Sequence, residues 1–398
     1  MKLRMYNVGF GDCFLLSENN EHLLIDFGSD TPIILDSISR NIISACQDEC
    51  VSILLTHFHL DHINGILETD CMKHLDVRNV YMPDLFDMRN CSSKLSFLQI
   101  VILEDVFRNV FLNNSKRRIT LFDLLIKLVN KQTNVNFLKR NDSFVFSSKK
   151  YDVLWPCYNQ IKINKRFEDS LILFLSKIGM IDSPENRELS PQVKVKIKVV
   201  DELIEVLLNY YNDLSQKKDI NVDRISSDCE KFLEQLNKFD GVFLQQKSLL
   251  KEKLNALIQL GNEISLVFQD KPQNEKSIIL MTGDVKKQHL HKIISCKDDP
   301  QMSKEFEIIK APHHATETHF IEYLPKNKVI LASNGNPKKA HNRYGKIAYQ
   351  YALYIDNMDT KMICTNPRCL LLETCLVHKC QNCSGKKNES EFFIEYVI

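Results

Sequence analysis

The sequence predicts an α/β protein whose layers of strands and helices are interrupted by an inserted helical segment. The 398 residues begin with short apolar runs that alternate with turns, and such runs return after about residue 263. Between them, residues 160–260 form long, charged, amphipathic stretches with few glycines and prolines. At 44% hydrophobic residues, a chain of this length can bury a large core.

The elements of the first half follow from these alternations. The segment around 33–46 has helical spacing and precedes a buried strand, so strand, helix and strand succeed one another. Residues 84–140 also carry helical spacing. The expected strands are 3–8, 13–17, 23–28, 53–55 and 151–156, the last closed by a proline.

The middle and the second half complete the predicted organisation. Leu203, Leu207 and Leu214 give the middle one apolar helical face. Further strands are expected at 264–268, 277–281, 308–310 and 329–332. We therefore expect the first half of the α/β domain at 1–158, a helical insertion at 159–262, and the second half with a cysteine-rich tail at 263–398. The insertion is expected to be a lid or spacer, and a surface for a protein partner or self-association.

Composition limits the class of protein. Lys plus Arg is 52 and Asp plus Glu is 51, so net charge gives no argument for nucleic acid. No run approaches the roughly 18 apolar residues of a membrane span, and no secretory segment is recognisable at the start. Thirteen cysteines then indicate reduced thiols or metal ligands. A cytoplasmic protein is expected.

One motif carries most of the chemistry. His57, His59, Asp61 and His62 follow directly after an apolar run that reads as a buried strand. In an extended segment His57 and His59 point the same way. Two imidazoles can thus share one metal position, with a carboxylate and a third imidazole at a neighbouring one, and such donors suit zinc, manganese or iron. The alternative is a surface loop that happens to be rich in histidine.

Three later segments place polar side chains at the ends of apolar runs. Asp284 ends Thr282-Gly283-Asp284, and His313 and His314 follow Pro312. The third segment is 333–335, with the sequence Ser-Asn-Gly. Each is a weak or moderate signal alone, but their order after the histidine motif makes a metal centre at one sheet edge the expected arrangement.

With these motifs the sequence resembles the metallo-β-lactamase superfamily. Within it, the sequence looks most like the hydrolase domain of ComEC-type DNA-uptake proteins and their stand-alone relatives. The motifs that carry the resemblance are 9–12, 24–28, 56–62, 282–284, 312–314 and 333–335. They lie within residues 1–80 and 262–350, under half of the chain. The resemblance implies an αββα sandwich with metals at one sheet edge.

The resemblance also implies roles for single residues. The first metal would be held by His57 and His59, the second by Asp61, His62 and His313, and Asp284 would bridge them; Asp26 would steady the loops. Many members supply a further histidine to the first metal. Between the motif and the bridging aspartate, only His74 is available here, and it reads as a surface residue. The first position is therefore expected to be partly occupied, completed by water or by a residue near Cys157.

The expected chemistry is hydrolysis by metal-activated hydroxide. A divalent cation lowers the pKa of bound water towards 7, and two cations can stabilise both oxygens of a phosphodiester displacement. Asp61 is counted among the catalytic residues, and the proton donor to the leaving oxygen is expected to be His314 or His341, with His319 a further candidate. Lys338, Lys339 and Arg343 are either phosphate contacts or a solvated surface.

The cysteine-rich tail leaves two interpretations open. Cys380 and Cys383 form a C-x2-C half-site, and further cysteines and a histidine lie nearby at Cys364, Cys369, Cys375 and His378. One structural zinc needs four such ligands, but the spacing matches no standard zinc finger. A structural zinc in the Cys364–Cys383 tail and a set of buried free thiols are both consistent with it.

The expected function is a metal-dependent phosphodiesterase or nuclease that acts on DNA or RNA with two zinc or manganese ions. One alternative is a small-molecule hydrolase for a lactone, thioester or amide, which the neutral charge favours. The other is a binding or effector module with a degenerate metal site, which the missing histidine favours.

Overall fold

The computed structural model describes residues 1–90, 93–112, 117–129, 133–181, 194–334, 347–348, 350–351, 354, 360–365 and 393–398. Two compact units divide the chain. We call Met1–Pro83, Asn136–Pro156 and Glu263–Ile398 the α/β unit, and Asp84–Val135 and Cys157–Asn262 the helical unit. Each is described by itself below.

The described residues form two seven-stranded sheets, which belong to the α/β unit except for the first two residues of β6. The first has the order β14-β1-β2-β3-β4-β5-β6 and the second β13-β12-β11-β10-β9-β8-β7. The first sheet comprises β1 (Lys2–Tyr6), β2 (Cys13–Glu18), β3 (Glu21–Phe27), β4 (Cys50–Leu54), β5 (Asp76–Pro83), β6 (Asn134–Leu138) and β14 (Phe393–Val397). The second comprises β7 (Ser143–Phe146), β8 (Lys149–Trp155), β9 (Val267–Asp270), β10 (Lys276–Met281), β11 (Glu305–Lys310), β12 (Lys326–Ala332) and β13 (Lys361–Cys364).

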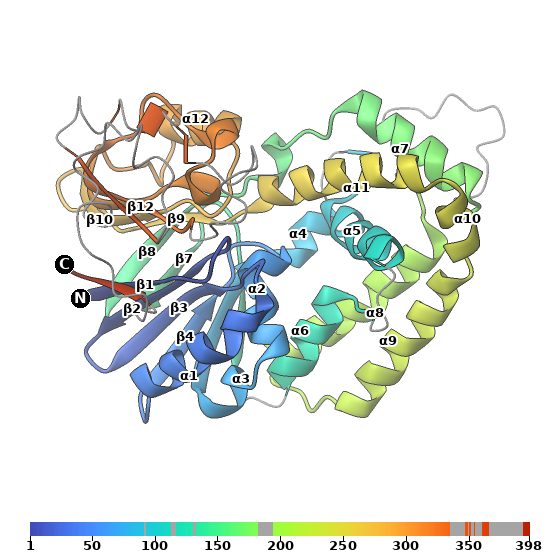
Figure 1. Ribbon diagram of the computed structural model, residues 1–398, viewed down its shortest axis with the longest axis horizontal. Helices are drawn as coiled ribbons and strands as arrows, with labels where there is room; N and C mark the ends of the chain where they lie inside the picture. Colours follow the sequence, from blue (N-terminus) through green and yellow to red (C-terminus); the bar gives the residue numbers. More distant parts are fainter. Residues whose placement is uncertain are drawn as a thin grey trace. The chain divides into compact units, whose positions relative to one another are not determined.

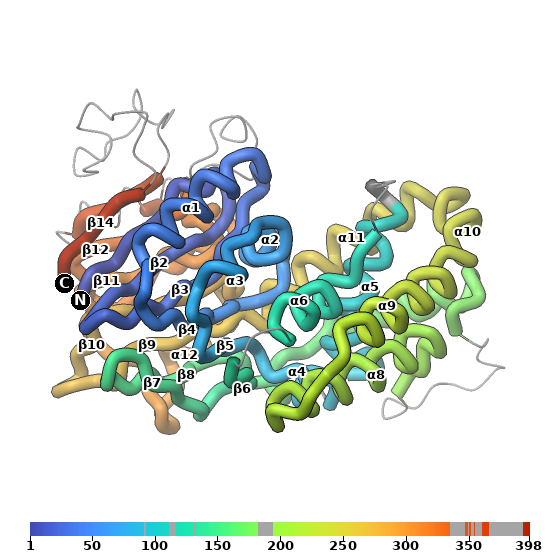
Figure 2. Tube along the Cα trace, turned by 90° about the horizontal axis from the view of Figure 1, so that it is seen from below, coloured from blue at the N-terminus to red at the C-terminus, as the bar shows by residue number. Residues whose placement is uncertain are grey.

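The two sheets bury their inner faces against each other. Phe14 and Ile25 of the first sheet belong to the same buried apolar cluster as Phe268 and Ile279 of the second. Helices α1 (Leu35–Ala45), α2 (Leu60–Glu68) and α3 (Cys71–His74) cover the outer side of the first sheet, and α12 (Lys287–Ser295) lies outside the second (Figures 1 and 2). This layering confirms the predicted αββα sandwich.

Parallel pairing brings the site loops to the same edges of the sheets. In the first sheet β3, β4 and β5 are parallel neighbours, and in the second β10 to β13 are. The carboxyl ends of parallel strands meet at one edge, which is where open α/β sheets bind ligands. The predicted motifs follow β3, β4, β10, β11 and β12 at these ends. Strand β14 pairs antiparallel with β1, a pairing that we did not predict.

The helical unit is built from amphipathic helices, as predicted for the middle of the chain. Leu203, Leu207 and Leu214 are buried on one face of α8. The long helix α5 packs against α11 and α8, and the rings of Phe107 and Phe243 meet edge to face at 5.4 Å. The helices are α4 (Leu85–Arg89), α5 (Phe97–Leu112), α6 (Thr120–Val129), α7 (Lys165–Lys177), α8 (Lys198–Ser215), α9 (Val222–Asn237), α10 (Asp240–Gln245) and α11 (Lys247–Gly261).

The helical unit contains more of the chain than the segment 159–262. Residues 84–135, which we assigned to the first half of the α/β domain, are grouped with it by their contacts. The expected boundaries at 158 and 262 therefore stay a prediction. Among the described residues, no helix is both long and apolar enough to cross a bilayer.

Candidate metal centre

The histidine motif folds into a buried cluster between β4 and α2. His57 is fully buried, its Nε2 lies 3.0 Å from His59 Nδ1, and its ring centroid is 4.1 Å from that of His62. Burial lowers the pKa of His57 well below its usual value, with His62 and His59 adding to the effect. A neutral imidazole keeps a lone pair for a metal ion, so His57 is suited to ligation.

Asp26 fixes the orientation of His62. Its Oδ1 accepts from the Thr56 backbone N–H at 2.7 Å, and its Oδ2 accepts from the Thr56 hydroxyl at 2.6 Å. His62 Nδ1 donates to the same Oδ2 at 2.8 Å, so His62 Nε2 is directed at Asp284 Oδ2, 3.2 Å away. A carboxylate that holds the far nitrogen of an imidazole sets the tautomer that a metal ligand needs. The geometry agrees with the supporting role that the resemblance implied for Asp26.

Two glycines let the loops approach the start of α2. A Cβ on Gly28 would collide with the backbone nitrogen of His62, and one on Gly11 would lie 2.6 Å from the carbonyl oxygen of Asp61. The loops are then joined by hydrogen bonds from Asp12 N to Asp61 O at 3.1 Å and from Gly28 N to Asp12 O at 3.0 Å. Glycine is needed because backbone packs directly on backbone here.

Asp284 lies at the middle of the cluster. It follows β10 through Gly283, whose φ of +49° favours glycine. The Oδ2 atom of Asp284 is 3.2 Å from His62 Nε2, 3.6 Å from His314 Nε2 and 3.7 Å from His313 Nε2. Burial alone would raise the pKa of Asp284, but the neighbouring histidines outweigh it and hold the pKa well below its usual range. Asp284 is therefore an anion facing three imidazoles.

A strained turn presents the paired histidines. His313, His314 and Ala315 have φ of 46°, 55° and 64°, and such left-handed backbone costs roughly 1–3 kcal/mol per residue outside glycine. Two hydrogen bonds stabilise the turn: His313 N donates to Gly283 O at 3.2 Å, and Asn334 Nδ2 donates to His314 O at 3.0 Å. The turn directs His314 into the interior and leaves the side chain of His313 18% exposed.

The structure places His314, not His313, deepest in the cluster. His314 Nε2 lies 3.7 Å from Asp61 Oδ2, and its Nδ1 lies 3.2 Å from Asp12 Oδ1. Burial lowers the pKa of His314, yet Asp284 and Asp12 outweigh it and raise the pKa to about 9. Burial lowers that of His313 to about 4. His314, which was predicted as a proton donor, thus lies among the candidate ligands. His313, which was predicted as a ligand, contacts this cluster through Asp284.

Sequence reasoning missed Asp12 and Lys310, which form a buried ion pair in the cluster. Lys310 Nζ lies 2.5 Å from Asp12 Oδ2, and both side chains are about 1% exposed. The only signals were the last residue of the 9–12 turn and a lysine at the end of an apolar strand. Neither signal tells a buried pair from a surface charge.

Other predicted residues are placed as follows. His319 stacks on His313 at 4.1 Å between ring centroids, and Ser333 donates to the carbonyl oxygen of Gly11 at 2.5 Å. His74 is exposed at the end of α3, and Cys157 belongs to the helical unit. Outside the described residues lie His341, Lys338, Lys339, Arg343, Cys369, Cys375, His378, Cys380 and Cys383. Cys364 is described, and it is buried at the end of β13.

The donor set fits divalent cations. Within the described ranges four groups have ligand atoms within 4.8 Å of one another: His57–His62–Asp284, Asp61–His62–His314, Asp12–Asp26–His62 and Asp12–Asp284–His314. The fully buried His314 brings both ring nitrogens among carboxylates, with Nδ1 3.2 Å from Asp12 Oδ1 and Nε2 3.6 Å from Asp284 Oδ2. So many buried polar and charged groups are costly to desolvate, and a bound cation would stabilise them. Nitrogen and carboxylate donors suit zinc and manganese.

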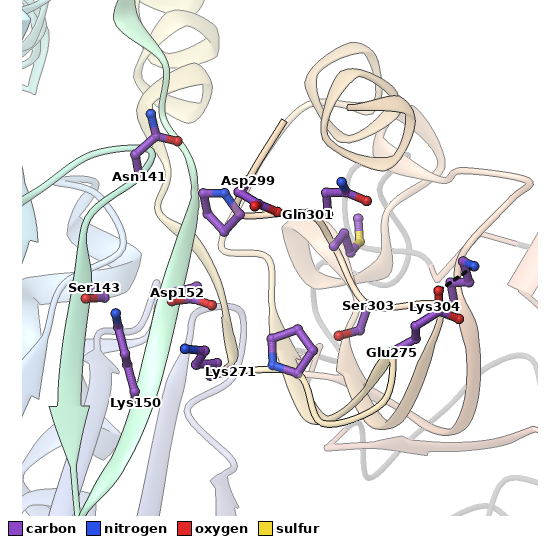
Figure 3. Close-up of a pocket in the computed structure, with 13 residues that line it drawn as sticks. Asn141, Ser143, Lys150, Asp152, Lys271, Glu275, Asp299, Gln301, Ser303 and Lys304 are labelled. Atoms are coloured by element: carbon purple, nitrogen blue, oxygen red, sulfur yellow. Dashed lines mark hydrogen bonds and ion pairs between the residues drawn. The ribbon is translucent and has the colours of Figure 1, made fainter. Parts of the chain in front are cut away.

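A separate hollow of about 620 Å³ lies at the other edge of the second sheet (Figure 3). Its residues Glu275 and Lys304 immediately precede β10 and β11, whereas Asp284 and His314 follow those strands. Side chains of both charge signs line it: Lys150, Lys271, Lys304, Asp152, Glu275 and Asp299. The hollow is therefore not an entrance to the metal cluster.

Comparison with known proteins gives partial likenesses. A family model described as "Anti-Pycsar protein Apyc1" matches residues 6–100, which include the histidine motif. The metallo-beta-lactamase fold protein YhfI from Bacillus subtilis is 14% identical over 38% of this chain and 52% of its own, so about half of YhfI is covered; the TM-score is 0.21. BJP-1, a subclass B3 metallo-beta-lactamase of Bradyrhizobium japonicum, is 14% identical over 59% of this chain and 92% of its own, with a TM-score of 0.23.

None of these names is that of a ComEC-type protein, so that finer resemblance stays an expectation. At such low TM-scores the two solved structures say nothing about the function of this chain. No functionally curated protein matches the sequence.

Proposed function

We propose that the protein is a metal-dependent phosphodiesterase that cleaves DNA or RNA. The observation that carries the proposal is the buried Asp284 carboxylate, which faces imidazole nitrogens from two other loops at 3.2–3.7 Å. A buried anion among so many imidazoles has little structural purpose, because each such group is expensive to desolvate. A bound cation would pair with the carboxylate and accept the lone pairs of the imidazoles, which accounts for the cluster.

Residues of these donor groups would hold two neighbouring cations. Because Asp26 holds Nδ1 of His62, that histidine has one nitrogen for one cation. The first cation would be held by His57, His59 and Asp284, and the second by Asp61, His62 and His314. When bound, divalent cations supply an activated water at neutral pH and offset the charge that develops on the phosphodiester oxygens. Two adjacent positions favour phosphodiesters, since both the attacking and the leaving oxygen need stabilisation.

The chain's own side chains then have distinct tasks. Asp61 is the ligand candidate that solvent reaches, with its side chain 26% exposed, and the neighbouring histidines hold its pKa below the usual range although burial opposes them. It stays a carboxylate at neutral pH and can accept the proton of the attacking water. In our proposal His314 is a ligand. His313, its partly exposed neighbour, is neutral at pH 7 because burial lowers its pKa to about 4, so it donates a hydrogen bond to the leaving oxygen while water supplies the proton.

The family model that matches residues 6–100 is named for an anti-Pycsar protein, and its range includes His57, His59, Asp61 and His62. The match supports a shared metal chemistry in this part of the chain. It leaves the phosphodiester itself open, so cyclic nucleotides belong in the substrate panel beside DNA and RNA.

The test is an activity panel on purified protein loaded with zinc, manganese or magnesium. Single- and double-stranded DNA, RNA and cyclic nucleotides are expected to include a cleaved substrate. Asp61→Ala combined with His62→Ala should abolish cleavage, whereas His74→Ala, which changes an exposed histidine outside the four donor groups, should keep it. Cleavage of a lactone, thioester or amide with no phosphodiester cleaved would favour the small-molecule hydrolase, which the net charge of +1 allows.

A further inference from the structure

A buried lysine lies inside the candidate metal centre. Lys310 is the last residue of β11, and its Nζ contacts Asp12 Oδ2 at 2.5 Å, the carbonyl oxygen of Gly283 at 2.8 Å and Asp284 Oδ1 at 3.4 Å. All three partners accept from the ammonium group. Parallel pairing of β11 with β12 fixes the backbone at this position, with Lys310 opposite Leu331. The ammonium group is thus held by the sheet and by three oxygens.

Asp12 would otherwise be a cation ligand. It contributes to two of the four donor groups, Asp12–Asp26–His62 and Asp12–Asp284–His314. Its Oδ2 is the atom that Lys310 contacts, and its Oδ1 is 3.2 Å from His314 Nδ1. A divalent cation at either group would lie within a few ångströms of the ammonium, and like charges this close repel strongly where water is excluded. The lysine and such a cation therefore exclude each other.

We propose that Lys310 is a fixed internal cation that removes Asp12 from the ligand set. It limits the centre to two positions built without Asp12, one from His57, His59 and Asp284 and the other from Asp61, His62 and His314. By holding Oδ1 of Asp284, the ammonium also leaves Oδ2 turned to the imidazoles. The inference rests on the metal centre of the proposed function and specifies how many cations it accepts.

Metal content distinguishes this role from ordinary support of the fold. Lys310→Met removes the charge and keeps an unbranched side chain, so Asp12 becomes available and the variant should bind one more divalent cation per chain than wild type. The double variant Lys310→Met, Asp12→Asn should return to the wild-type number. A lysine that only supported the fold would change stability and leave the number of cations unchanged.

The measurement is metal per chain by elemental analysis after equilibration with zinc or manganese and removal of free metal. Lys253→Met is the matched control, because Lys253 is also buried but lies in the helical unit and donates to Ser170 Oγ at 2.7 Å. Its metal content should equal that of wild type. An unchanged metal content in Lys310→Met would overturn the proposal.

The double variant decides the matter if Lys310→Met does not fold, because it leaves neither partner of the ion pair charged and unpaired. Wild-type metal content in the double variant supports the proposal, and loss of one cation shows that Asp12 is a ligand and overturns it. No substrate enters these measurements. A protein with the predicted metal contents that cleaves no phosphodiester would contradict the proposed function and leave this inference standing.

Discussion

Asp26→Asn tests whether a hydrogen bond beyond the ligands controls metal binding. Asp26 has φ of 53°, and asparagine tolerates this left-handed backbone as well as aspartate does, so the substitution adds little strain. The asparagine oxygen can still accept from Thr56 N, now 2.7 Å from Oδ1. In place of Oδ2, however, an NH₂ group would face His62 Nδ1, which now donates at 2.8 Å.

The new amide would donate to His62 Nδ1, and the imidazole proton would move to Nε2. That nitrogen faces Asp284 and is the one that a cation needs. Loss of such an outer partner typically lowers metal affinity 10- to 100-fold, about 1.4–2.8 kcal/mol. Calorimetric titration of metal-free protein with zinc or manganese measures the effect, and circular dichroism checks the fold.

Asp48→Asn is the matched control, since Asp48 also has a positive φ of 60° but is exposed in the turn after α1. It should bind metal as wild type does. A folded Asp26→Asn protein with an affinity within twofold of wild type would refute the reasoning.

Three further predictions concern Gly28 at the start of α2, the paired histidines and the helical unit. Gly28→Ala should displace the start of α2, lower the free energy of unfolding by about 1–3 kcal/mol and weaken metal binding. The control Gly241→Ala, where a Cβ meets nothing within 4 Å, should change neither stability nor metal binding. Equal denaturation midpoints for the two variants would contradict this. Metal analysis should find a cation lost in His314→Gln and kept in His313→Gln, although both lose activity; the reverse pattern would return the ligand role to His313. Burial raises the pKa of Asp105 to about 7, above the roughly 3.9 of an aspartate in the unfolded chain. Wild type should therefore lose stability relative to Asp105→Asn as pH rises from 4 to 7, by up to about 4 kcal/mol in urea titrations. A stability difference that does not vary with pH would show that the pKa is not raised.

The αββα sandwich was predictable because its signals are local. Apolar runs mark β3, β4, β10, β11 and β12, and a polar residue at the end of each run marks the edge where the site lies. The spacing of the histidine motif is likewise a local property. The pairing of β14 with β1 was not predictable, since it joins the two ends of the chain and nothing in either strand names its partner.

The site was predictable as a set of residue types, but not in its detail. The placement of His314 deeper in the cluster than His313 depends on consecutive left-handed residues, which no periodicity encodes. The Asp12–Lys310 pair joins a loop to the end of β11, which lies far away in the sequence. Residues 84–135 have helical spacing, but spacing does not say which body a helix packs against. In each case tertiary contacts decide the outcome.

The most direct test of the metal centre is a titration of metal-free protein with manganese or zinc, followed by cleavage of a chromogenic phosphodiester. The account predicts no cleavage without metal, a rise with each cation bound, and saturation when both cation positions are filled, one at His57, His59 and Asp284 and the other at Asp61, His62 and His314. Cleavage that survives complete removal of metal, or none for any phosphodiester at full metal content, would contradict the account.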